Sequence, residues 1–388
     1  MTLLTLGGLF LLGLIADILG RFTPSPRITL LLVAGVLIGP GGFSLVSKDF
    51  VDGWFVPLTH IALAMVGFLM GQKLSLAALK QRGRLIVMLA GGKVIGAALS
   101  VSLIVWLISR DLSLALVMGG VATATAPAAT FDVVHESGLT GTFADDLLSV
   151  VAIDDALGLM LFSILLTAAV SMTNGGLSPD TALHGLTDLF GSLLLATALA
   201  IPMSFLTGRL DFGQRKGEPI QSEAIEFVLI CAGAATMLNL SPILASMTMG
   251  ALVVSLAKHH NRPFHAIEGV EWPFMILFFI LAGASLNLNT INTVGYLVIA
   301  YILARAAGTY LGFFGAAVFM KSDDQTRNLM GLTLMPQAGV ALSMALIASQ
   351  RLPDSAEIIL SLVLCATILL EFFSPMLTRR ILNKVANS

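Results

Sequence analysis

The stretch Val151-Ala152-Ile153-Asp154-Asp155-Ala156-Leu157-Gly158-Leu159-Met160 places two adjacent aspartates inside an apolar run long enough to cross a membrane. A carboxylate at the bilayer centre costs at least about 2.5–3.5 kcal/mol, so it persists only where it is paired, hydrated or used. Consecutive helical residues point about 100° apart, so these carboxylates cannot face each other as a catalytic dyad. We therefore expect a separate partner for each aspartate. An ion or proton carrier site is the favoured hypothesis, and a purely stabilising pair is the alternative.

The composition is that of a polytopic helical membrane protein. Of the 388 residues, 56% are hydrophobic and 11% are charged, whereas a soluble protein carries about a quarter charged residues. The two cysteines, Cys231 and Cys365, lie in apolar runs, which predicts small buried residues rather than a disulfide or a metal site. The first residues form an apolar span without a basic leader or a small-residue cleavage site, so we expect a retained helix. Nothing in the sequence calls for a cofactor.

The predicted fold is an all-α polytopic membrane protein with about 13 transmembrane helices and short connections. We treat 1–388 as a single integral membrane transporter domain and expect no cytosolic regulatory domain. The predicted spans are 2–20, 27–46, 54–72, 85–108, 112–134, 144–170, 184–207, 222–239, 241–257, 271–287, 293–319, 326–349 and 355–378.

The basic residues predict the orientation of these spans. With thirteen spans, sixteen of the 21 lysines and arginines fall on one side and three on the other, while Lys93 and Arg305 remain within spans. Basic residues concentrate on the cytoplasmic side of membrane proteins. We therefore predict a multi-pass protein of the cell (inner) membrane, with its N-terminus outside and its C-terminus cytoplasmic.

Two of the spans contain helix-breaking sequence near mid-depth. Residues 122–130 read Ala-Thr-Ala-Thr-Ala-Pro-Ala-Ala-Thr, and residues 334–340 read Leu-Met-Pro-Gln-Ala-Gly-Val. Interrupted spans in corresponding halves indicate an inverted-repeat transporter with its site at the breaks. The repeats would be 1–170 and 222–378, joined by a linker helix at 184–207. The residues predicted at the crossed broken helices are Thr123, Thr125, Ala126, Pro127, Pro336 and Gly339. A helix that is merely kinked at residues 122–130 is the alternative.

Buried charges offer partners for the aspartates. Arg305 lies about eleven residues into its span, too deep for its side chain to reach the interface, so we expect it to pair with Asp154 or Asp155. A salt bridge remote from transport is the alternative. Lys93 is also deep, and we expect it to find a carboxylate or to extend toward the cytoplasm. Asp132, Glu226 and Glu371 lie toward the cytoplasmic ends of their spans, where they would line an acidic funnel or simply be solvated.

Five segments, in their order along the chain, resemble the second family of monovalent cation:proton antiporters, a group of sodium/proton exchanger-like transporters. They are Thr-Ala-Thr-Ala-Pro-Ala-Ala-Thr (123–130), Ala-Ile-Asp-Asp-Ala (152–156), Phe-Phe-Ile-Leu-Ala-Gly-Ala-Ser-Leu (278–286), Arg305-x-x-Gly308-x-Tyr310-Leu311-Gly312 and Met-Pro-Gln-Ala-Gly-Val-Ala-Leu (335–342).

The resemblance implies the bacterial sodium/proton antiporter fold, with a dimerisation domain beside a core domain that holds two crossed broken helices. It implies a homodimer that exchanges Na⁺, or Li⁺ or K⁺, for protons by alternating access. It makes Asp155 the shared ion and proton carrier and pairs Asp154 with Arg305. From the break at residues 122–130 we expect Thr125 and the backbone freed around Pro127 to contribute further oxygens. Some electrogenic members have lysine at the Arg305 position. Because arginine keeps its proton, the arginine here favours one-for-one exchange; two-proton exchange, with Asp154 itself taking up a proton, is the alternative.

Other functional classes fit less well. An intramembrane aspartyl protease needs aspartates on two helices that face each other, and no histidine cluster suggests a metal hydrolase, so we do not expect an enzyme. A potassium/proton antiporter or potassium efflux system is the first alternative. A sodium-coupled organic-solute symporter is the second, although a few carboxylate and hydroxyl oxygens suit a small hard cation better than a bulky solute.

Overall fold

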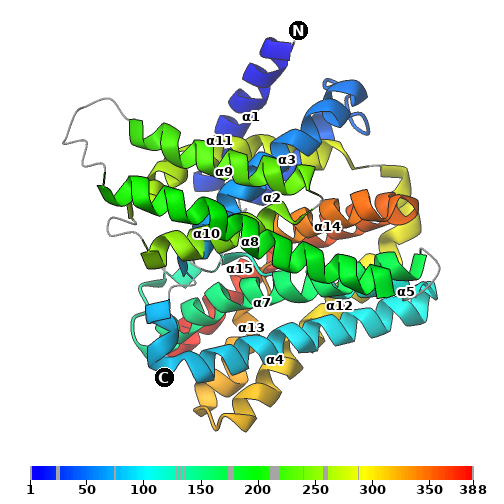
Figure 1. Ribbon diagram of the computed structural model, residues 1–388. Coiled ribbons are helices and arrows are strands. Elements are labelled where there is room, and N and C mark those ends of the chain that lie inside the picture. The colour runs from blue at the N-terminus through cyan, green and yellow to red at the C-terminus, as the bar shows by residue number, and fades with distance from the viewer. Residues whose placement is uncertain are drawn as a thin grey trace. The chain divides into compact units, whose positions relative to one another are not determined.

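The computed structural model describes residues 2–22, 27–73, 76–127, 130, 133–134, 137–173, 179–209, 219–238, 240–256, 261–286 and 288–386. Within these residues every regular element is a helix (Figure 1). The prediction of an all-α membrane protein is therefore confirmed. Asp132 lies outside the described residues.

Helix is present in each of the thirteen predicted spans. The long helices are α1 (Thr2–Phe22), α3 (Lys48–Lys73), α4 (Leu76–Ser109), α7 (Thr142–Thr173), α8 (Pro179–Arg209), α9 (Pro219–Met237), α11 (Asn261–Ala284), α12 (Leu288–Phe319) and α15 (Ala356–Ala386). The short ones are α2 (Arg27–Ile38), α5 (Leu112–Val121), α10 (Pro242–Leu256), η1 (Thr326–Met330), α13 (Gly331–Thr333), α14 (Gly339–Arg351) and η2 (Pro353–Ser355). Among the described residues, seven helices are by themselves long and apolar enough to cross a membrane.

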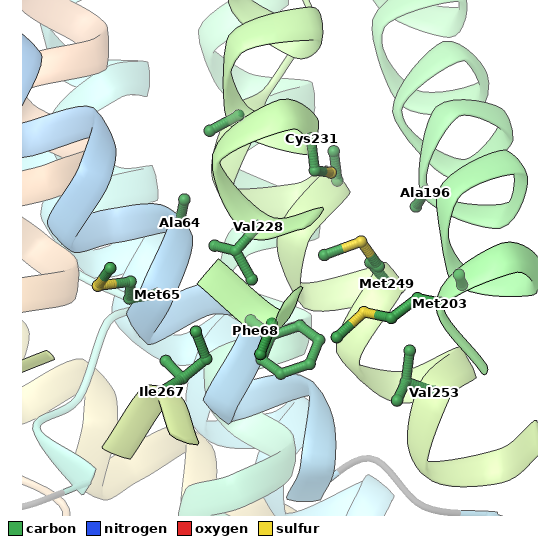
Figure 2. Packing of buried hydrophobic residues seen from close by; sticks show 14 of the residues in the cluster. Ala64, Met65, Phe68, Ala196, Met203, Val228, Cys231, Met249, Val253 and Ile267 are labelled. Atoms are coloured by element: carbon green, nitrogen blue, oxygen red, sulfur yellow. The ribbon is translucent and has the colours of Figure 1, made fainter. Parts of the chain in front are cut away.

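The chain divides into two compact units. The first comprises Met1–Phe10, Asp52–Arg82 and Pro179–Phe278. Its apolar core joins α3, α8, α9, α10 and α11, and Figure 2 shows side chains from these helices converging around Phe68. The Phe68 ring stacks on Phe264 with centroids 4.6 Å apart. This packing holds these five helices together.

The second unit comprises Leu11–Val51, Gly83–Ser178 and Phe279–Ser388, and it contains the aspartate pair. One of its apolar clusters joins α4, α7 and α12 through buried residues such as Leu89, Leu147 and Phe313. Leu334, which follows α13, belongs to the same cluster. The segment that follows α13 is therefore packed against this apolar cluster.

Helices α4 and α12 approach each other closely enough to exclude side chains from the contact. A Cβ atom on Gly96 of α4 would lie 2.7 Å from the Cα of Gly312, and a Cβ on Gly312 would lie 2.8 Å from the Cα of Gly96. Only glycine permits such an approach of two backbones. The contact fixes the register between the helices that carry Lys93 and Arg305.

Candidate transport centre

The aspartate pair lies deep inside the second unit. Asp154 and Asp155 are both 0% exposed, and Asp154 is the thirteenth residue of α7. At 1.5 Å per residue this places the pair about 18 Å from the start of the helix, which is roughly half of a bilayer's hydrocarbon thickness. The predicted mid-depth position of the pair therefore agrees with the helix boundaries.

The first interruption lies next to the aspartates. Helix α5 ends at Val121, residues 124–126 are extended or irregular, and helical backbone resumes at Pro127. Pro127 therefore begins the second half-helix instead of interrupting the first, a position where its missing N–H costs nothing. Thr125 Oγ lies 2.9 Å from Asp154 Oδ1 and 3.1 Å from Asp155 Oδ1. One threonine hydroxyl therefore contacts both carboxylates.

Side chains from three other segments donate to the four carbonyl oxygens of residues 121–124, at and just beyond the end of α5. Gln337 Nε2 donates to Val121 O at 3.1 Å, and Lys93 Nζ donates to Thr123 O at 2.6 Å. Arg305 supplies the other two contacts, from Nε to the carbonyl of residue 122 at 3.1 Å and from Nη2 to that of residue 124 at 2.7 Å. The negative end of this half-helix thus carries two fixed cations, as the helix dipole favours.

The second interruption meets the first directly. Between Thr333, the last residue of α13, and Gly339, the first of α14, the backbone is not helical. The amide of Ala126 donates to Pro336 O at 3.0 Å, and Arg305 Nη1 donates to Met335 O at 2.7 Å. Tyr301, one turn before Arg305, bonds Gln337 through its hydroxyl. Helix α12 therefore ties the two breaks together.

The partner of Asp154 is Lys93, and the predicted ion pair with Arg305 was wrong. Lys93 Nζ lies 2.9 Å from Asp154 Oδ2, and both side chains are 0% exposed. The guanidinium of Arg305 has a planar fork of donors that suits several carbonyl oxygens at once, and these are what it contacts. The ammonium of Lys93 is a point charge on a long stem, which reaches Asp154 from α4.

The carbonyls of residues 121–124 at the first break already accept hydrogen bonds from Gln337, Arg305 and Lys93. The acidic funnel stays a prediction: Glu226 is exposed on α9, Glu371 on α15 is buried at 1% exposure, and Asp132 lies outside the described residues. The described residues contain no group of three His, Cys, Asp or Glu side chains placed to hold a metal ion.

The residues that meet here, Lys93, Thr125, Asp154, Asp155 and Arg305, are called the transport centre below. Sequence reasoning placed the last four of them at mid-depth and left Lys93 either with an unspecified carboxylate or extended toward the cytoplasm; it did not assign Tyr301 or Gln337. For Lys93 a usable signal existed, since an ionised lysine eight residues inside an apolar span needs a carboxylate. For Gln337 the clue was its position between Pro336 and Gly339.

Comparison with known proteins agrees with this arrangement. The computed structure resembles that of the sodium proton antiporter MjNhaP1 from Methanocaldococcus jannaschii at pH 8, with a TM-score of 0.76 and 16% identity over 100% of both chains. A second MjNhaP1 structure, from electron microscopy, matches with a TM-score of 0.72 and 17% identity, covering 100% of this chain and 98% of the other. No curated protein matches the chain in sequence. The sequence does match the transmembrane sodium/hydrogen exchanger family over residues 7–384, and the chain therefore belongs to that family.

Proposed function

We propose that the chain is a secondary antiporter that exchanges a monovalent cation for protons by alternating access, with Asp155 as the shared carrier. Na⁺ is the first cation to test, and K⁺ and Li⁺ are the alternatives. Membership of the sodium/hydrogen exchanger family and the fold shared with a sodium proton antiporter support this proposal.

The observation that carries the proposal is the hydroxyl shared by the two carboxylates. A threonine hydroxyl has one proton to donate and can accept another bond. Asp154 is held ionised by Lys93 at 2.9 Å, so it is the natural acceptor of the Thr125 proton. The contact of Thr125 with Asp155, at 3.1 Å, is then favourable when Asp155 carries a proton or when a cation lies between the oxygens. Asp155 is thus the carboxylate whose surroundings suit an exchangeable cargo.

Competition at one carboxylate is enough to couple the two fluxes. Asp155 near neutral pH would hold either a proton or a cation, and in either state its charge is compensated. An empty, ionised Asp155 would leave a buried carboxylate with neither a proton nor a cation on it, which is costly. A centre that moves only when loaded therefore exchanges the two ions and does not leak either one.

The test is proton flux in proteoliposomes that contain a pH-sensitive dye, with Na⁺, K⁺ and Li⁺ added in turn. We expect cation-driven proton movement for at least one of them, and its loss in a folded Asp155→Asn variant. Retained exchange in that variant would show that Asp155 is not the shared carrier of cation and proton. Uptake of an organic solute that requires Na⁺, without proton movement, would favour the symporter alternative.

We also propose that the two six-span halves, residues 1–170 and 222–378, are inverted repeats joined by the helix at 184–207. Matching close contacts support this. Gly35 and Gly250 are each the ninth residue of their helices, α2 and α10. A Cβ on Gly283 would lie 3.1 Å from the Cα of Gly35, and a Cβ on Gly250 would lie 3.3 Å from that of Gly71. The α2–α11 and α3–α10 contacts are the pair that a two-fold relation between the halves would exchange.

The proposal also covers the membrane location, the orientation and the oligomeric state of the antiporter. We propose that it acts as a homodimer in the cell membrane, with the N-terminus outside and the C-terminus cytoplasmic. The distribution of basic residues supports the orientation, and the resemblance to the antiporter family supports the dimer. Cysteine accessibility at the two ends of the chain, in whole cells and in inverted vesicles, would test the orientation.

A further inference from the structure

One buried carboxylate remains outside the mechanism proposed above. Glu371 is the sixteenth residue of α15 and is 1% exposed. Its Oε1 atom is buried without a hydrogen-bond partner among the described residues, and so is Oγ of Thr367, one turn earlier on the same helix. A buried carboxylate without hydrogen bonds is costly unless a proton or a nearby positive charge relieves it.

The positive charge that acts on Glu371 is that of Arg305. Helix α15 packs against α2, α5, α12, α13, α14 and η2. The ionisable residues on those elements, within the described part of the chain, are Arg27, Tyr296, Tyr301, Arg305, Tyr310, Arg351 and Asp354. Of these, Arg305 interacts electrostatically with Glu371. Glu371 is therefore linked to the transport centre through the residue that clamps both helix breaks.

The charges of this region can be counted. Five charged side chains of the described residues are at most 1% exposed: Lys93, Asp154, Asp155, Arg305 and Glu371. If all five are ionised they sum to one negative charge, and one bound proton or monovalent cation makes the sum zero. If Glu371 is protonated, the empty centre is neutral and a bound cation leaves one uncompensated positive charge. Burying such a charge is unfavourable, so the state of Glu371 decides how well a cation binds.

We propose that Glu371 is a second proton-binding site of this protein, and that it must be ionised for the cation to bind tightly at Asp155. This inference rests on the antiport proposed above and adds to it a control of cation binding by pH. As pH falls, protons compete for Asp155 directly and, separately, neutralise Glu371, so cation affinity falls for two reasons. Ser374 and Thr378 place two further buried hydroxyls on α15 beyond Glu371, and Thr378 donates to Thr333 O at 3.4 Å.

The experiment measures the apparent KM for the cation as a function of pH in proteoliposomes, for the full chain and for Glu371→Gln. Glutamine keeps the shape of the side chain but stays neutral, like protonated glutamate. We expect exchange to persist, with KM at alkaline pH raised about fivefold or more, the lower end of a usual coupling between sites. We also expect the acidic slope of log KM against pH to exceed one in the unaltered protein and to fall toward one in the variant. Glu357→Gln, at an exposed position on the same helix, is the matched control and should leave both values unchanged.

The outcomes separate the two proposals. If the unaltered protein exchanges no cation for protons, the antiport itself fails. If it does, and a folded Glu371→Gln variant keeps both the KM and the slope, Glu371 is a neutral structural group and this inference is overturned. Should the glutamine variant not fold, Glu371→Asp replaces it, because aspartate still titrates in a displaced position. A shifted pH midpoint of the second proton supports the inference, and an unshifted midpoint overturns it.

Discussion

A double-mutant cycle on Lys93 and Asp154 tests the pairing that the structure assigns. Lys93→Met removes the ammonium 2.9 Å from Asp154 Oδ2 and leaves the carboxylate buried and ionised beside Thr125. Breaking a buried pair by removing one partner costs about 3–5 kcal/mol, because the other charge remains without compensation. Asp154→Asn in the same background removes that remaining charge. The double variant should therefore recover part of the loss, with a coupling energy of about 2–3 kcal/mol.

The assay is equilibrium unfolding of the purified variants in mixed detergent micelles, without transported cation. The comparison cycle uses Arg305→Met with Asp154→Asn. Arg305 contacts carbonyl oxygens and acts on Asp154 only at longer range, so its coupling to Asp154 should be smaller by at least about 1 kcal/mol. Additive losses for Lys93 and Asp154, together with strong coupling for Arg305 and Asp154, would refute the assignment and restore the pair expected from the sequence.

Two further predictions concern the cargo. Thr125→Val removes the hydroxyl that contacts both carboxylates. Since hydrogen bonds to charged groups contribute about 1.5–3 kcal/mol, the apparent KM for the cation should rise about 10- to 100-fold. Thr125→Ser keeps the hydroxyl, so its KM should stay near the original value. An unchanged KM in the valine variant would exclude Thr125 as a ligand. Because one proton and one monovalent cation each neutralise the same five-residue charge set, exchange should be one for one: with equal cation and proton gradients, an imposed membrane potential should move no cation into proteoliposomes. Cation movement that follows the potential, and that disappears in Lys93→Arg, would instead make Lys93 the carrier of a second proton.

The membrane fold could be predicted from the sequence because each feature that indicates it lies within a short stretch of the chain. Apolar runs of about twenty residues, Pro- and Gly-containing interruptions and the depth of Asp154 can all be counted along the chain. The boundaries of the first break were less accurate, because Pro127 can either end one helix or start the next. The structure has it start the second half-helix, with α5 ending six residues earlier, at Val121.

The partner of Asp154 could not be predicted in the same way. Two basic residues, Lys93 and Arg305, lie within spans, and depth alone does not distinguish them. The choice depends on the contact of Gly96 with Gly312, which sets how far each side chain has to reach. It also depends on where the four carbonyls at the end of α5 point, and one sequence does not specify that. The burial of Glu371 depends likewise on how α12 and α14 pack against α15.

The satisfied carbonyls explain why cation binding should depend on pH at all. A site built mainly from backbone carbonyls could hold a cation over a wide pH range, because those oxygens do not titrate. Here Lys93, Arg305 and Gln337 already donate to the carbonyls of residues 121–124. The oxygens left for a cargo belong to Asp155 and Thr125, beside an Asp154 that Lys93 compensates. Cation binding then rests on an ionised carboxylate, which is the group that a proton neutralises. In the antiport proposed above, the capped half-helix leaves Asp155 as the titratable ligand, for which proton and cation would compete.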